Sequence, residues 1–253
     1  SRPPCAGRRA RRSDGRPRIL HVPRPRLARA QRALAHGVFD LAPCHDAAHG
    51  FRRGRSVLTH ASLHAGQYVV IRIDLRDFFT TIHARRICSV LEALGYRHSV
   101  ASLLARLTTR LGRLPQGAPT SPAISNLCAF RLDARLAGLA GAAGAVYSRY
   151  ADDLTFSGGP DLARSALRFC AEVALIVHEV GFSVNHRKTR IMRSGTQQRV
   201  TGTVVNAAPS VSRRERDQLE AILTNCVRRG PASQNRSDHP DFEAHLRGRV
   251  AWI

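Results

Sequence analysis

Two β-rich segments of this chain carry aspartates, one at the end of a strand and one at a turn, and that pattern restricts its fold more than any other feature. Residues 67–74 read QYVVIRID, which predicts a buried central strand that ends on Asp74. Residues 146–157 read VYSRYADDLTFS, which predicts a hairpin with Asp152 and Asp153 at its tip. Carboxylates are costly to bury and repel one another, so a fold that gathers all three needs a cation there. In phosphoryl transfer that cation is Mg²⁺, usually as a pair.

Asp152 and Asp153 also have a simpler interpretation as solvated turn residues, because aspartate is common in hairpin turns. An Asp-Asp turn taken alone favours that interpretation. The hairpin therefore allows either a metal-dependent enzyme or an ordinary antiparallel sheet with a polar turn, and other parts of the chain have to distinguish them.

The chain is strongly basic, with a formal net charge of +22. So much positive charge repels itself unless a polyanion neutralises it, and the usual polyanion is nucleic acid. Ribosomal proteins, histones and RNA chaperones are equally basic, so charge indicates the partner and leaves the chemistry open. A hydrophobic fraction of 43% over 253 residues excludes a disordered protein. The arginine-rich residues 1–32 predict an arm that lies on phosphates, or, for residues 1–12, a basic tail without a specific role.

Strands and helices alternate without a regular βαβ rhythm, which favours an α+β fold over a doubly wound sheet. Thr120-Ser121-Pro122 has the residue types of a helix start, and Gly181 those of a helix end. We expect helices at 27–41, 84–95, 98–111, 120–139, 161–180 and 212–229, strands at 188–192 and 199–206, and a polar, less ordered tail.

The six cysteines predict neither disulfides nor a zinc site, because they lie far apart without a C-x-x-C pair or a histidine at zinc spacing. The pairs His45/His49 and His60/His64 lack an H-E-x-x-H context and predict no metal site either. No apolar run approaches eighteen residues and no signal peptide is present. We therefore expect a cytoplasmic protein without membrane contact.

Four segments together resemble the reverse transcriptase family and occur in the family's order, so the joint match is specific. In chain order they are IRIDLRDFFTTI at 71–82, LPQGAPTSPAISN at 114–126, YADD at 150–153 and GFSVNHRKTRIM at 181–192. The resemblance covers residues 14–250 and implies RNA-directed DNA synthesis on a right-hand polymerase fold with an antiparallel palm sheet. It implies fingers at 1–66 and 84–118, palm at 67–83 and 119–208, and a short thumb at 209–253.

Two further segments look like the retron branch of that family: AHGFRRGRS at 48–56 and Val200-Thr201-Gly202. Retron enzymes also carry N-A-x-x-H before the first acidic strand, and here His60 replaces the asparagine. A group II intron-type enzyme is the alternative, although its longer maturase region is absent from this sequence. The retron resemblance implies a structured noncoding RNA as template and primer, a branched RNA–DNA hybrid, and an effector protein in phage defence.

By the same resemblance, Asp74, Asp152, Asp153 and the main chain of Leu75 would hold two Mg²⁺. Leu75, Phe79 and Gln116 would line the dNTP pocket, with Phe79 as the ring that excludes a ribose 2′-hydroxyl. Phe78 would be the core ring, since alternate residues at a strand end face opposite ways. Arg12 and Arg18 would bind the triphosphate, while Arg55 and the Val200-Thr201-Gly202 segment would contact the template.

Lys188 is the single lysine among 40 lysine and arginine residues. Wherever any cation would serve, this chain uses arginine, whereas a lysine can release a proton to departing pyrophosphate. The rival function is a catalytically silent scaffold that keeps the fold only to hold RNA. A silent scaffold has no physical need for clustered carboxylates, so intact Asp74, Asp152, Asp153, Gln116 and Lys188 favour the polymerase.

Overall fold

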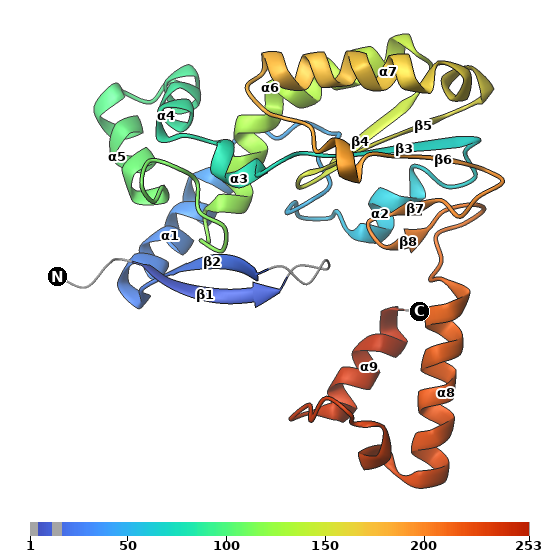
Figure 1. Ribbon diagram of the computed structural model, residues 1–253. Coiled ribbons are helices and arrows are strands. Elements are labelled where there is room, and N and C mark those ends of the chain that lie inside the picture. Colours follow the sequence, from blue (N-terminus) through green and yellow to red (C-terminus); the bar gives the residue numbers. More distant parts are fainter. Residues whose placement is uncertain (1–4, 12–16, 253) are drawn as a thin grey trace.

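The computed structural model describes residues 5–11 and 17–252 (Figure 1). Where the sequence predicted an arginine-rich arm, the structure has an antiparallel hairpin of β1 (Cys5–Arg11) and β2 (Pro17–Pro23). Arg12 lies outside the described residues. Arg18 lies in β2, where its Cα is paired with that of Ala10.

A four-stranded antiparallel sheet forms the centre of the molecule, in the order β4 (Val146–Tyr150), β5 (Asp153–Gly158), β3 (Val69–Asp74), β6 (Arg190–Arg193). This arrangement confirms the predicted central strand, the predicted hairpin and the α+β class. β3 is buried along almost its whole length, as its β-branched run requires. In the pairing of β3 with β5, Val69 lies opposite Gly158 at one end and Asp74 lies opposite Asp153 at the other.

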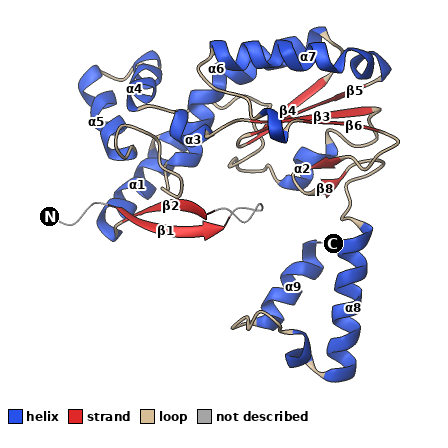
Figure 2. Ribbon diagram, viewed as in Figure 1, coloured by secondary structure: helices blue, strands red, loops and turns tan. Residues whose placement is uncertain are grey.

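Two long helices, α6 (Ser121–Ala142) and α7 (Pro160–Glu179), cover one face of the sheet (Figure 1). The core between them and the sheet includes Phe156, which stacks on Tyr147 at 4.8 Å and meets Phe169 edge-on at 5.1 Å. The other face carries the short helix α2 (Val57–Ser62) and the hairpin of β7 (Arg199–Val200) and β8 (Thr203–Val204) (Figure 2). Both faces of the sheet are therefore covered.

The remaining helices lie at the two ends of the molecule (Figure 1). At one end α1 (Pro25–Gly37) packs beside the β1–β2 hairpin, and α4 (Ala84–Ala93) and α5 (His98–Thr108) pack together on the same side of the molecule. At the opposite end α8 (Arg213–Arg229) and α9 (Phe242–Trp252) extend away from the sheet. Short helical turns are α3 (Phe78–Thr81), η1 (Phe39–Leu41), η2 (His186–Lys188) and η3 (Pro231–Gln234). Among the described residues, none of these helices combines the length and apolarity needed to cross a membrane.

Local signals in the sequence placed most helix ends correctly. Pro122 lies in the first turn of α6, and Gly181 follows α7 in a left-handed conformation with φ 77°. Two expectations were wrong. The C-terminal tail contains α9, and Phe78 and Phe79 lie on α3 instead of a strand end, because Asp77 turns the chain with φ 47°.

Candidate active site

The sheet brings the three aspartates to one end of its two central strands, β3 and β5. Asp74 is the last residue of β3 and is paired with Asp153, the first residue of β5. The Leu75 N–H donates to the main-chain carbonyl of Asp152 at 2.9 Å, which fixes the hairpin turn beside the end of β3. Ala151 makes this tight turn possible by adopting a left-handed φ of 56°. The cluster predicted from the sequence is therefore a consequence of strand register.

Asp74 is buried and both of its carboxylate oxygens have partners. Asn185 Nδ2 donates to one oxygen at 3.0 Å and Lys188 Nζ to the other at 3.0 Å. The Asn185 N–H also donates to the Asp74 main-chain carbonyl at 2.7 Å. The segment that contains the single lysine is thus bound directly to the end of β3.

Asp153 shows the electrostatic cost that a cluster of carboxylates predicts. Burial raises its pKa to about 6, and the nearby Asp152 and Asp74 add to the effect. Arg72 opposes the shift, with its Nε 3.3 Å from an Asp153 oxygen. At neutral pH the carboxylate is ionised at a free-energy cost, which binding of a proton or a cation would reduce.

The carboxylates at this end of the strands are hard oxygen ligands, which fit a hard divalent cation. In the described structure the three carboxylates do not all approach within 4.8 Å of one another. Asp74 is turned toward Asn185 and Lys188, and Asp153 toward Arg72. A bound cation would take the place of the cationic Lys188 and Arg72 at these carboxylates, and the main-chain carbonyl of Leu75, the residue after Asp74, would be a further oxygen ligand.

Replacing Asp153 with asparagine should stabilise the metal-free protein at neutral pH. The folded-state pKa of about 6 lies above the unfolded value of 3.8, so the folded chain loses stability as pH rises between them. Chemical denaturation in a chelator should show Asp153→Asn more stable by about 1–3 kcal/mol above pH 6. The difference should disappear near pH 4, and a pH-independent difference would contradict the electrostatic cause.

A family profile described as reverse transcriptase (RNA-dependent DNA polymerase) matches residues 11–217. The chain belongs to the reverse transcriptase family. It is 42% identical over 258 residues to retron Mx65 reverse transcriptase of Myxococcus xanthus, covering 95% of this chain and 58% of that protein. It is 39% identical to retron Mx162 reverse transcriptase of the same organism, covering 95% and 55%. These matches confirm the resemblance to bacterial retron-type reverse transcriptases.

The chain spans just over half the length of those two relatives. Among solved structures it resembles a foamy viral protease-reverse transcriptase in complex with an RNA/DNA hybrid, with 18% identity and a TM-score of 0.49. That match covers 86% of this chain and 25% of the viral chain.

The two neighbouring phenylalanines of this reverse transcriptase-family chain differ in their surroundings. Phe78 packs against Phe182 at 5.5 Å and lies under the Arg149 guanidinium at 5.7 Å, as expected for a core ring. Phe79 lies 6.1 Å from the ring of Phe51, which is half-exposed. Both rings are buried in the main core cluster, and they face different neighbours because of the helical turn of α3 and not because of strand alternation. The role of Phe79 at the dNTP stays a prediction.

Gln116 lies in the loop that connects to α6, and this loop docks on β2. The Gln116 carbonyl accepts from the His21 N–H at 2.8 Å. Gly117 has φ 100°, and a side chain there would meet the Leu20 Cβ at 3.4 Å, so glycine suits this close approach. The structure therefore places the predicted nucleotide-pocket loop beside the strand that carries Arg18.

The Val200-Thr201-Gly202 segment forms the turn between β7 and β8, with φ 47° at Thr201 and 91° at Gly202. The Val200 side chain is fully buried with Ala61, Val70 and Val205. Any template contact by Val200 therefore has to come from its main chain. Arg55 is exposed just before the start of α2, and its contact with a template stays a prediction.

The retron-like histidine segment holds α2 and the V-T-G turn on the sheet. His64 bonds Ser157 through Nδ1 and Ser148 through Nε2, both at 2.7 Å. His60 Nδ1 lies 3.4 Å from the Thr201 hydroxyl. Burial lowers the pKa of His60 to about 2 and that of His64 to about 3, so both are neutral.

A buried ion pair behind the hairpin turn was missed in the sequence. Arg149 and Asp133 are fully buried and 2.6 Å apart, and the Tyr147 hydroxyl donates to the same carboxylate at 2.8 Å. Arg149 also donates to the Ala151 carbonyl at 3.0 Å, which holds the turn from behind. A charged residue on the apolar face of a predicted helix was the available signal for Asp133.

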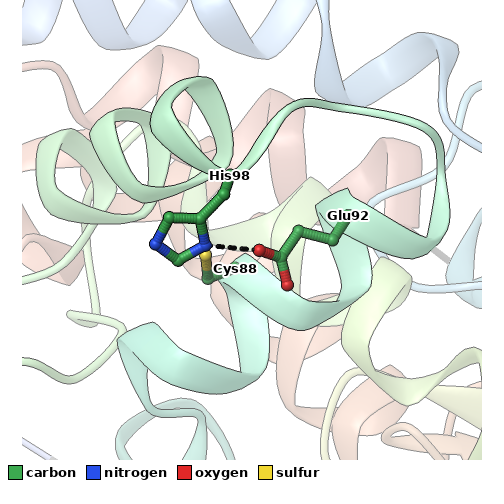
Figure 3. Close-up of side chains that lie close together, drawn as sticks. All are labelled: Cys88, Glu92 and His98. Carbon is green, nitrogen blue, oxygen red and sulfur yellow. Dashed lines mark hydrogen bonds and ion pairs between the residues drawn. The ribbon is translucent and has the colours of Figure 1, made fainter.

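A second group missed in the sequence links α4 to α5, where Cys88, Glu92 and His98 lie within 4.8 Å of one another (Figure 3). His98 Nδ1 is 2.5 Å from a Glu92 oxygen. Burial raises the pKa of the Cys88 thiol, and Glu92 adds to the effect. No cysteine had a histidine at zinc spacing in the sequence, but the turn between the helices brings His98 to Cys88. Glu92 and His98 are exposed, and their contact joins the end of α4 to the start of α5.

Proposed function

We propose that this chain is the polymerase portion of a retron-type, RNA-directed DNA polymerase. The observation that carries the proposal is the register that sets Asp74 opposite Asp153 with the Asp152 carbonyl bonded to Leu75. Family membership and a net charge of +22 support it, because the charge suits a nucleic-acid partner. We assign fingers to 1–66 and 84–118, palm to 67–83 and 119–208, and thumb to 209–253.

In this proposal two Mg²⁺, held by Asp74, Asp152, Asp153 and the Leu75 carbonyl, would activate the primer 3′-hydroxyl and neutralise the triphosphate. Phe79 excludes the ribose 2′-hydroxyl by steric contact and thereby selects dNTPs. The Gln116 loop orients the incoming nucleotide, and Arg12 and Arg18 bind its triphosphate through bidentate contacts.

Lys188 supplies a proton to the departing pyrophosphate from Nζ. In the described structure this atom is bonded to Asp74, and the side chain is half-exposed, so its own bond rotations can carry Nζ to the solvent side of the carboxylate. Arg55 and the V-T-G turn bind the template backbone on the sheet face that carries α2.

The retron resemblance, which agrees with the names of the two relatives, leads to a finer proposal. The template and primer are a structured noncoding RNA, and the product is a branched RNA–DNA hybrid made for phage defence with an effector protein. A silent RNA-binding scaffold remains the alternative from another class. The clustered carboxylates, with Asp74 buried, argue against it, because nothing in RNA binding requires the raised pKa of Asp153. A group II intron-type enzyme is the alternative within the family.

The test is primer extension by the purified chain on an RNA template with an annealed DNA primer, the four dNTPs and Mg²⁺. A polymerase extends the primer with Mg²⁺ and stops when a chelator is added. The scaffold alternative predicts RNA binding without extension under every metal condition. Supplying the cognate RNA without a primer then tests the finer proposal, because a branched product stays attached to RNA in a denaturing gel.

Lys188→Arg should lower the maximal rate of single-turnover incorporation by about 100-fold while nucleotide affinity changes little. Arginine keeps the positive charge beside Asp74 but does not release a proton near neutral pH. The matched control is the exposed neighbour Arg187→Lys, which should behave as wild type. Full activity in Lys188→Arg would reduce Lys188 to an ion-pair partner of Asp74.

A further inference from the structure

A short segment at 47–51 is fastened along the outer edge of β4, next to the hairpin turn. The Arg149 N–H donates to the Ala47 carbonyl at 2.7 Å, and the His49 N–H donates to the Arg149 carbonyl at 2.8 Å. Asn126 Nδ2 donates to the Gly50 carbonyl at 2.9 Å. Three hydrogen bonds from the sheet and α6 therefore fix the position of the segment, which we call the 47–51 strap.

Gly50 lets this strap lie directly on the turn that carries the aspartates. A Cβ at position 50 would be 2.6 Å from the Ala151 nitrogen and 3.2 Å from the Tyr150 carbonyl carbon. Both neighbours are main-chain atoms, so any side chain would push the strap off the turn. The residue after Gly50 is thereby held at a defined place beside the active site.

That residue, Phe51, has two unfavourable properties for an ordinary surface position. Its φ of 63° is left-handed, which is strained for a bulky side chain, and its ring is 48% exposed. Backbone strain of this kind is concentrated at ligand-binding and catalytic sites. The ring lies 6.1 Å from that of Phe79 and 6.5 Å from that of Tyr150. It is therefore placed between the side chain proposed to contact the dNTP sugar and the turn that leads to Asp152.

We propose that the Phe51 ring packs against the nascent base pair, formed by the templating base and the incoming nucleotide, and contributes to its selection. This inference rests on the proposed function, which places the nucleotide sugar at Phe79 and the primer end at the aspartates. An exposed aromatic face stacks on any nucleobase. A ring fixed by a glycine strap does so without first being ordered, so a correctly shaped pair is contacted more fully than a mismatched one.

The test compares Phe51→Asn, Phe51→Tyr and wild type. Asparagine tolerates a left-handed φ but has no ring, whereas tyrosine keeps the ring. The control is Phe130→Ala, which removes a similarly exposed ring on α6 that contacts His45 at 5.5 Å. We expect Phe51→Asn to lose roughly tenfold or more in apparent dNTP affinity. Discrimination against mismatched dNTPs should fall as well, while Phe51→Tyr and Phe130→Ala stay near wild type.

Thermal unfolding separates this role from a structural one. Relief of the strained φ should leave Phe51→Asn at least as stable as wild type, so function and stability change in different directions. Wild-type affinity and mismatch discrimination in Phe51→Asn would overturn the inference. So would a loss of activity that is matched by a loss of stability.

A binding measurement keeps the inference distinct from the proposed function. An RNA template with 2-aminopurine at the templating position, annealed to a DNA primer, reports stacking by fluorescence quenching without any chemistry. Quenching by wild type that disappears in Phe51→Asn supports the contact even if no extension occurs, in which case only the proposed function fails. Extension by wild type with equal quenching in both proteins rejects the contact and leaves the proposed function standing.

Discussion

Asp152→Asn should lower dNTP incorporation by roughly three decades or more, while RNA binding stays near wild type. Asparagine has the volume of aspartate but no charge, so the proposed metal site loses a ligand while the packing of the turn is kept. The turn itself should survive, because its bond from the Leu75 N–H goes to the main-chain carbonyl of residue 152. Single-turnover extension and a filter-binding assay with the same RNA measure the two quantities separately.

The matched control is Asp161→Asn at the start of α7, where an exposed aspartate pairs only with Arg164 among the described residues. This variant removes the same charge from the chain and should extend primers as wild type does. If Asp152→Asn retained incorporation within tenfold of wild type, Asp152 would be a solvated turn residue after all. An equal gain in RNA binding in both aspartate variants would instead indicate a general effect of the removed negative charge.

The strands and the hairpin were predictable because their signals are local. A β-branched run ending in Asp74 specifies a buried strand, and the short turn around Ala151 joins two such runs. The meeting of Asp74 with Asp153 follows from strand register, which the sequence indicated only through its family resemblance. Local signals did not reveal α3, since the β-like run continues past Asp74 until Asp77 turns the chain.

Side-chain partners of distant residues could not be read from spacing. Lys188 was expected at the pyrophosphate, and its bond to Asp74 joins residues 114 positions apart. The same holds for Phe51, whose proposed role depends on how the 47–51 strap lies along β4 and not on the neighbouring residues in the sequence. Such contacts are set by how elements pack, and periodicity describes only which face of each element is buried.

Asp133→Asn should destabilise the protein by about 3–5 kcal/mol, because it leaves the Arg149 guanidinium buried without its counter-ion. Both side chains are fully buried. Burial alone would lower the pKa of Arg149, but the adjacent Asp133 raises it above its ordinary value, so the arginine remains charged at every accessible pH. The asparagine side-chain oxygen can still accept from the Tyr147 hydroxyl. The loss of stability then reports the missing charge and not the loss of this hydrogen bond. Urea denaturation measures the change.

A double-mutant cycle with Arg149→Met separates the ion pair from its surroundings. Removing both charges leaves neither one buried alone, so Asp133→Asn with Arg149→Met should cost less than the sum of the single changes. Arg149 also holds the Ala151 carbonyl, and any variant without it should slow incorporation even at temperatures where the protein is fully folded. The stability of the double variant should therefore recover while its polymerase rate does not. Additive free energies of unfolding would show that the two charges do not depend on each other, and a recovered rate would show that the turn does not need Arg149.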